Sequence, residues 1–207
     1  MEPTIQNIKD PNILRESIGD AAKELFSYYG FKKTAMDDIA QKARVAKGTI
    51  YNYFRNKDDL IRYVMRKEGE TLISKIKEGL LSQKTPQLKF REMIIIKIKF
   101  IKELRLLFAL THKTALEILP IPVEIIPVVQ PELKEIAGQE IDIIKEILEE
   151  GVKNSVFRPI NISETAKIMR LAMKGFELKW GIEMDSEKAT AELDNILDIM
   201  LKGLEIR

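Results

Sequence analysis

The sequence from Thr34 to Leu60, TAMDDIAQKARVAKGTIYNYFRNKDDL, decides the fold of this chain. Thr34 is followed three residues later by Asp37, the spacing of a capping box, so a helix is predicted to begin just after the threonine. Apolar residues then recur at helical spacing, and after a break of about three residues a second helix carries Ile50 and Phe54 on its inner face. Two short helices joined in this way predict a helix-turn-helix.

The outer face of the second predicted helix is polar, aromatic and cationic. Its residues are Lys47, Gly48, Thr49, Tyr51, Asn52 and Tyr53. An α-helix fits the major groove of DNA, where hydroxyls and amides read base edges while the phosphates accept hydrogen bonds from Lys and Tyr. Glycine costs about 1 kcal/mol relative to alanine inside a helix, so Gly48 suggests a close approach of the backbone to DNA.

Positive charge is concentrated on the same part of the chain. Residues 32–67 contain ten Lys and Arg against four Asp, an excess of +6, whereas the whole chain has a formal net charge of +2. Asn56 is predicted to cap the next helix, which places Lys57 at a helix start, where it can act as a phosphate clamp. A short helical hairpin alone is also common in ordinary all-α proteins, and the clustered charge favours nucleic-acid binding.

The residues of this region resemble the TetR family of transcriptional regulators. The matching positions are Ala22, Leu25, Phe26, Gly30, Thr34, Ile39, Ala40, Ala43, Val45, Lys47, Gly48, Thr49, Ile50, Tyr51, Tyr53, Phe54, Lys57 and Leu60. The resemblance implies an all-α fold, with an N-terminal three-helix DNA-binding domain over residues 1–57. It also implies a larger helical C-terminal domain over residues 58–207 that binds an effector and dimerises.

The resemblance also assigns roles to individual residues. It implies phosphate or backbone contacts from Thr34, Lys47, Tyr51, Tyr53 and Lys57, and it places Gly48, Thr49 and Asn52 nearest the bases. Two positions depart from the family pattern. Arg44 stands where the family usually has glycine, so a positive φ there would strain it, and its side chain is a further candidate phosphate or base contact. Ala46 stands where serine or threonine often caps the recognition helix.

The composition of the chain argues against an enzyme. Its 207 residues include no cysteine and one histidine, which excludes thiolate chemistry and sites built from two Glu-x-x-His motifs. No GxGxxG, GxxxxGK[ST] or GxSxG motif is present. We therefore expect no catalysis, no cofactor and no metal. The most apolar stretch, residues 93–110, contains five charged residues, so we expect no membrane span and a cytoplasmic protein.

Further helices are predicted on both sides of the motif. They span residues 12–30, 58–81, 88–119, 132–153, 163–181 and 186–204. Residues 94–101 also alternate as in a strand, although the resemblance favours a helix. Four prolines between residues 119 and 131 predict that this segment is not one regular helix.

Several apolar and aromatic residues of the C-terminal domain are candidates for an effector cavity, because such cavities are mostly apolar. They are Phe100, Phe108, His112, Met169, Met173 and Trp180. Such side chains at helical spacing are more often part of a helical core, and a single histidine is more often structural than a ligand contact. An effector bound there is expected to be small and apolar or amphipathic.

Together these observations predict a homodimeric, ligand-responsive regulator, more readily a repressor, that leaves a palindromic operator when an effector binds. The resemblance places the dimer interface in the late C-terminal helices, at residues 132–153 and 163–181. Two-fold symmetry suits half-sites about 34 Å apart on one face of DNA. The alternatives are a nonspecific nucleoid-type DNA-binding protein and an all-helical protein-interaction module.

Overall fold

The computed structural model describes residues 10–109, 125–183 and 186–205. Within these ranges the chain is almost entirely helical, which confirms the predicted all-α fold. The helices are α1 (Pro11–Tyr29), α2 (Met36–Lys42), α3 (Lys47–Tyr53), α4 (Lys57–Leu81), α5 (Pro86–Ala109), α6 (Ile126–Lys153), α7 (Ile162–Glu183) and α8 (Ser186–Lys202).

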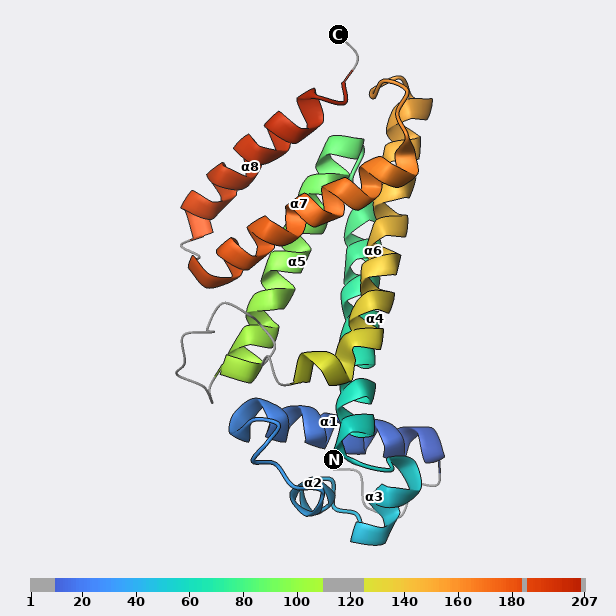
Figure 1. Cartoon of the computed structure of the whole chain (residues 1–207), viewed down its shortest axis with the longest axis vertical. Coiled ribbons are helices and arrows are strands. Elements are labelled where there is room, and N and C mark those ends of the chain that lie inside the picture. Colours follow the sequence, from blue (N-terminus) through green and yellow to red (C-terminus); the bar gives the residue numbers. More distant parts are fainter. Residues whose placement is uncertain (1–9, 110–124, 184–185, 206–207) are drawn as a thin grey trace.

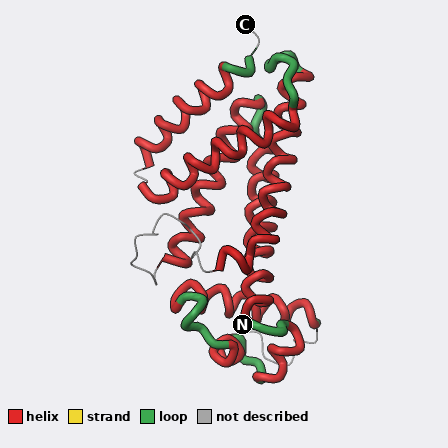
Figure 2. The backbone as a smooth tube through the Cα atoms, in the orientation of Figure 1, coloured by secondary structure: helices red, strands yellow, loops and turns green. Residues whose placement is uncertain are grey.

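The molecule has a head, made of α1 to α3, and a body, made of α4 to α8 (Figure 1). The long helix α4 leads from the head into the body, where it packs against α5 and α6. Helix α7 packs on both α5 and α6, and α8 packs against α5 at the edge of the body. Figure 2 shows the same arrangement as helices joined by loops. None of the described helices is long and apolar enough to span a bilayer.

Side-chain caps fix the starts of the two helices that frame the head. The Asp10 carboxylate accepts a hydrogen bond from the Asn12 amide at 2.8 Å, at the start of α1. The Asn56 side chain accepts one from the Asp59 amide at 2.8 Å, as predicted for the start of α4. Gly30 ends α1 with φ of 81°, a conformation that suits glycine.

The last part of the proline-rich segment is helical, whereas the sequence predicted a helix only from residue 132. Helix α6 begins at Ile126 and not at Glu132, and it includes Pro127 and Pro131. Pro127 lies in the first turn, where the missing amide hydrogen has no partner within the helix. Pro131 removes an internal hydrogen bond, and Figure 1 shows the first turns of α6 at an angle to the rest.

The alternative of a strand at residues 94–101 was wrong, because these residues lie inside α5. Of the helix predicted over residues 88–119, the described part ends with α5 at Ala109. The final helix was predicted at residues 186–204 and is present as α8.

Small residues allow close contact where the head joins the body. Gly19 of α1 faces the ring of Tyr63 on α4, where an added Cβ would lie 2.5 Å from a ring carbon. Gly69 of α4 faces the Ile136 side chain of α6, and an added Cβ would again lie at 2.5 Å. Helix α4 is therefore held between α1 and α6, so a shift of α6 would act on the helix that carries the head.

Cations of α1 strengthen its contact with α4. The guanidinium of Arg15 lies 5.0 Å from the ring centroid of Tyr63 on α4 and 5.4 Å from that of Phe54, which follows α3. Further along the two helices, the Lys23 ammonium of α1 lies 2.5 Å from the Glu68 carboxylate of α4. These contacts fix the orientation of α1 against α4, and with it the orientation of the head.

Candidate nucleic-acid interface

The helix-turn-helix is built by α2, α3 and the tight turn between them. The side chains of Ile39, Ile50 and Phe54 are fully buried, so both helices face the core of the head with one side, as predicted. The Val45 amide donates to the Ala40 carbonyl at 2.9 Å and closes the turn. The opposite side of α3 is thereby left on the surface of the head.

Arg44 occupies the strained position of this turn. Its φ is 57°, in the left-handed region that suits the glycine usual at this site in the family. Its side chain is exposed, beside the start of α3. In the described part of the chain one other non-glycine residue, Ser155, has a positive φ. Because glycine would adopt this conformation without strain, the arginine at this position needs a reason other than the turn itself.

The capping box predicted at Thr34 was wrong. The residue is 2% exposed, and its hydroxyl donates to the Gly30 carbonyl at 2.9 Å and to the Leu25 carbonyl at 3.2 Å. Ala35 is the N-cap residue of α2, and its amide donates to the Asp38 carboxylate at 3.0 Å. Thr34 thus ties α2 to the end of α1 and offers no hydroxyl to a ligand at the surface.

Three of the predicted contact residues on α3 are well exposed. Lys47, the first residue of the helix, keeps 65% of its side chain exposed, and Tyr51 one turn later is 45% exposed. Asn52 is also exposed. The Lys47 ammonium lies 2.8 Å from the Asp37 carboxylate of α2, and this hydrogen bond raises the pKa of Lys47. The lysine therefore stays cationic around neutral pH.

The other predicted contact positions on α3 are Gly48, Thr49 and Tyr53. Thr49 and Tyr53 are half-buried at the flanks of the exposed face. Gly48 lies in its centre, and a Cβ added there would meet no atom within 4 Å from the described residues outside its own helical turn. The fold itself therefore has room for a side chain at Gly48.

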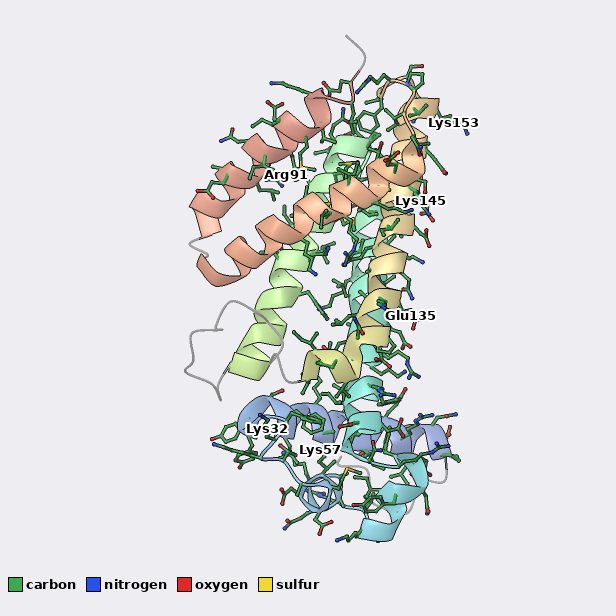
Figure 3. All side chains as sticks on the ribbon, viewed as in Figure 1. Lys32, Lys57, Arg91, Glu135, Lys145 and Lys153 are labelled. Atoms are coloured by element: carbon green, nitrogen blue, oxygen red, sulfur yellow. The ribbon has the colours of Figure 1, made fainter. Side chains whose placement is uncertain are left out.

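Lys57 differs from the role that the sequence predicted for it. Its ammonium donates to the Phe31 carbonyl at 2.7 Å and to the Thr34 carbonyl at 3.0 Å, and it lies 4.6 Å from the centroid of the Phe31 ring. Burial lowers its pKa. Lys57 therefore points into the head, where it ties the start of α4 to the connection between α1 and α2 (Figure 3).

The structure describes the side chains of three of the six effector candidates. Phe100 of α5 and Met169 and Met173 of α7 are buried members of the core, with at most 4% exposure. Phe108 and Trp180 lie on α5 and α7, but their side chains are outside the described part, as is all of His112.

A buried ion cluster joins three helices of the body. The Glu140 carboxylate of α6 pairs with the Lys97 ammonium of α5 and with the Arg170 guanidinium of α7, each at 2.9 Å. Lys97 and Glu140 are almost fully buried. No local sequence pattern predicts this cluster, because its three residues are distant from one another in the chain.

Exposed apolar residues lie on the last two helices of the body. Ile168 and Leu171 of α7 are 61% and 71% exposed, and Ile199 of α8 is 74% exposed. Large exposed apolar side chains one helical turn apart, as Ile168 and Leu171 are, are typical of an interface with another molecule. The sequence had suggested α6 and α7 for such an interface, whereas these side chains lie on α7 and α8.

Comparisons with known proteins agree with this architecture. Residues 18–64 match the family model described as bacterial regulatory proteins, tetR family. The uncharacterized HTH-type transcriptional regulator YhgD of Bacillus subtilis (strain 168) is 30% identical over 156 residues, which are 75% of this chain and 78% of that protein.

Two solved structures show the same fold. A transcriptional regulator from Cytophaga hutchinsonii ATCC 33406 has a TM-score of 0.73 at 20% identity, covering 95% of this chain and 100% of that one. The transcriptional regulator FadR from Bacillus subtilis, in complex with stearoyl-CoA, has a TM-score of 0.64 at 20% identity, covering 92% and 99%.

Proposed function

The chain belongs to the TetR family of bacterial regulatory proteins, and on that premise we propose that it is a ligand-responsive transcriptional repressor. In this proposal a homodimer binds a palindromic operator in the cytoplasm and leaves it when a small effector binds to the body. We place the boundary between the DNA-binding domain, residues 1–57, and the effector domain, residues 58–207, at the start of α4.

We assign DNA contact to the exposed side of α3 and the turn before it. Lys47, Tyr51 and Tyr53 supply donors for phosphates, and Arg44 adds a cation beside them. Gly48, Thr49 and Asn52 are proposed to lie nearest the bases. Thr34 and Lys57 are assigned internal roles, because both side chains are engaged by carbonyl groups of the head.

The open space beside Gly48 is the observation that carries the DNA assignment. Glycine is a poor helix former, costing up to about 1 kcal/mol relative to alanine, and no described residue outside the turn of α3 itself obstructs a Cβ at this position. A glycine that costs stability without serving the fold is explained if another molecule approaches its backbone. The backbone of a DNA-bound recognition helix comes this close to phosphates and bases.

The test compares two glycines that share this environment. At Gly138, within α6, an added Cβ would likewise meet no atom within 4 Å from the described residues beyond its own turn, so Gly138→Ala is a matched control for Gly48→Ala. Both variants are expected to be more stable in thermal unfolding. Only Gly48→Ala is expected to weaken binding to an operator, recovered beforehand by selecting bound fragments from random and genomic DNA. Equal operator binding by both variants would contradict the assignment.

We propose that α7 and α8 form the dimer interface. The exposed side chains of Ile168, Leu171 and Ile199 would be buried against the same helices of a second copy, as two-fold symmetry requires. Two heads related by this symmetry can then meet successive major grooves on one side of the operator.

For the effector we propose an amphipathic molecule held in the body. Phe100 of α5 and Met169 and Met173 of α7 supply buried apolar side chains to the body, and a structural neighbour is in complex with stearoyl-CoA. Stearoyl-CoA is therefore the first probe, with coenzyme A alone as the control. Stearoyl-CoA should raise the melting temperature and release the operator. If coenzyme A does neither, this class of effector is supported.

The proposed signal passes from α6 to α4. The Arg62 guanidinium of α4 donates to the Val128 carbonyl of α6 at 3.0 Å, and Ile136 of α6 packs against Gly69 of α4. A displacement of α6 by an effector would therefore shift α4 and change the distance between the two heads.

A further inference from the structure

An ion pair links the two helices of the helix-turn-helix at the proposed DNA-binding surface. The Asp37 carboxylate lies in the first turn of α2, 2.8 Å from the ammonium of Lys47 at the start of α3. The two side chains are 58% and 65% exposed, so the pair lies at the surface. A negative charge is thus held directly beside a cation that we assign to a phosphate.

We propose that Asp37 is a competing counter-ion that lowers the affinity of this chain for DNA by holding the Lys47 ammonium until a phosphate displaces it. This inference rests on the proposed function, because it needs Lys47 to contact DNA. Asp37 would thus lower the affinity for DNA without itself contacting the DNA.

The competition follows from the geometry of the pair. A phosphate that approaches Lys47 must replace the hydrogen bond from the ammonium to Asp37. Once displaced, the carboxylate stays well within a Debye length of that phosphate, about 8–10 Å, so salt screens their repulsion only in part. Both effects oppose binding, on operator and on nonspecific DNA alike.

Stability of the fold does not account for the pair. Exposed ion pairs contribute little to folding because solvent screens them and two long side chains must be ordered. An acidic residue in the first turn of α2 does interact favourably with the helix dipole. Removing the charge of Asp37 should therefore lower the stability of the head slightly while raising its affinity for DNA, and these opposite signs distinguish the proposal from general damage.

The head contains a matched control pair. Glu24 of α1 is paired with Lys42 of α2, and the Glu24 carboxylate is 64% exposed. Glu24→Gln therefore removes one carboxylate charge from the same head, and that carboxylate is likewise paired with a lysine. Lys42 is outside α3 and has no assigned DNA contact, so the control measures the general effect of one less negative charge.

The experiment measures the affinity of full-length variants for the recovered operator and for a random duplex of equal length. Asp37→Asn is expected to bind about two- to fivefold more tightly for each head engaged, the range that follows from typical exposed ion pairs. Glu24→Gln is expected to change affinity by clearly less. In a Lys47→Met background, Asp37→Asn is expected to have no effect, because its competitor is gone.

Three results would overturn the inference. Equal or weaker binding by Asp37→Asn, with Asp37→Ser giving the same result and both variants folded by circular dichroism, would show no competition at Lys47. Equal tightening with and without Lys47 would show a general field effect instead. If the wild-type chain binds no DNA, the proposed function fails and this inference with it, whereas wild-type binding with an unchanged Asp37 variant refutes this inference alone.

Discussion

Replacing Arg44 by glycine should make the protein more stable and a weaker binder of DNA. The residue has φ of 57°, a conformation that costs an L-residue about 1–2 kcal/mol and costs glycine almost nothing. Glycine loses about 0.5–1 kcal/mol more in backbone entropy on folding. The net gain expected for Arg44→Gly is therefore about 0.5–1 kcal/mol, or a rise in Tm of about 1–4 °C for a chain of this size.

The DNA-binding effect of the same substitution has the opposite sign. If the guanidinium contacts a phosphate, its loss lowers the salt dependence of operator binding by about one unit of log–log slope for each head. The assay is a titration of operator DNA at several salt concentrations, paired with thermal unfolding. Ser155→Gly is the matched control, because Ser155 has φ of 56° at the turn after α6, far along the chain from the head.

The melting temperature reports the backbone strain, and the operator titration reports the contact of the arginine with DNA. Ser155→Gly should reproduce the gain in stability and leave the operator titration unchanged. If neither glycine variant raises Tm, the positive φ at these two positions does not strain the fold. If Arg44→Gly raises Tm while affinity and salt slope stay at the wild-type values, the arginine has no contact with DNA.

Three further substitutions test the assembly, the head and the body. Leu171→Glu on α7 should give monomers in sedimentation, whereas Leu81→Glu, at an 87% exposed position at the end of α4, should remain dimeric. Lys57→Met should destabilise the head by about 1 kcal/mol by removing the donor shared by three carbonyl groups, yet should not change the salt slope of operator binding. Glu132→Met should raise stability by about 1–3 kcal/mol, because the Glu132 Oε2 atom is buried without a hydrogen-bond partner among the described residues.

The sequence predicted those features that depend on residues close together in the chain. Ile50 and Phe54 were assigned to the inner face of α3 from their spacing alone, and both are fully buried. Gly30 and Asn56 were expected to end α1 and to start α4, and they do so. The positive φ of Arg44 followed from the family pattern, because that position usually holds glycine.

Features that depend on distant residues were missed. A threonine before a helix can accept from that helix or donate elsewhere, and the carbonyl groups that Thr34 reaches belong to α1 and to the loop after it. The ammonium of Lys57 is likewise captured by carbonyl groups more than twenty residues earlier in the chain. No local pattern distinguishes these positions from an exposed cap and an exposed phosphate clamp.

The residues of the head that depart from local conformational preference lie together, at the turn into α3 and its first residues. Arg44 has an unfavourable φ, Gly48 is a poor helix former, and Ala46 at the N-cap offers no side-chain hydrogen bond to the first turn. The buried side chains of Ile50 and Phe54 stabilise α3 from its other side. Departures from local preference at one exposed surface are expected where another molecule must bind.

Ala46→Ser tests whether these costs are independent of DNA contact. A serine at this N-cap should stabilise the protein by about 1 kcal/mol, since its hydroxyl can accept from an amide of the first turn of α3. It changes neither the cations nor the open space at Gly48, so operator affinity should stay within a few-fold of wild type. An unchanged Tm would show that other groups already satisfy those amides. A large loss of affinity would mean that DNA approaches the start of α3 too closely for a hydroxyl, which would extend the contact surface to Ala46.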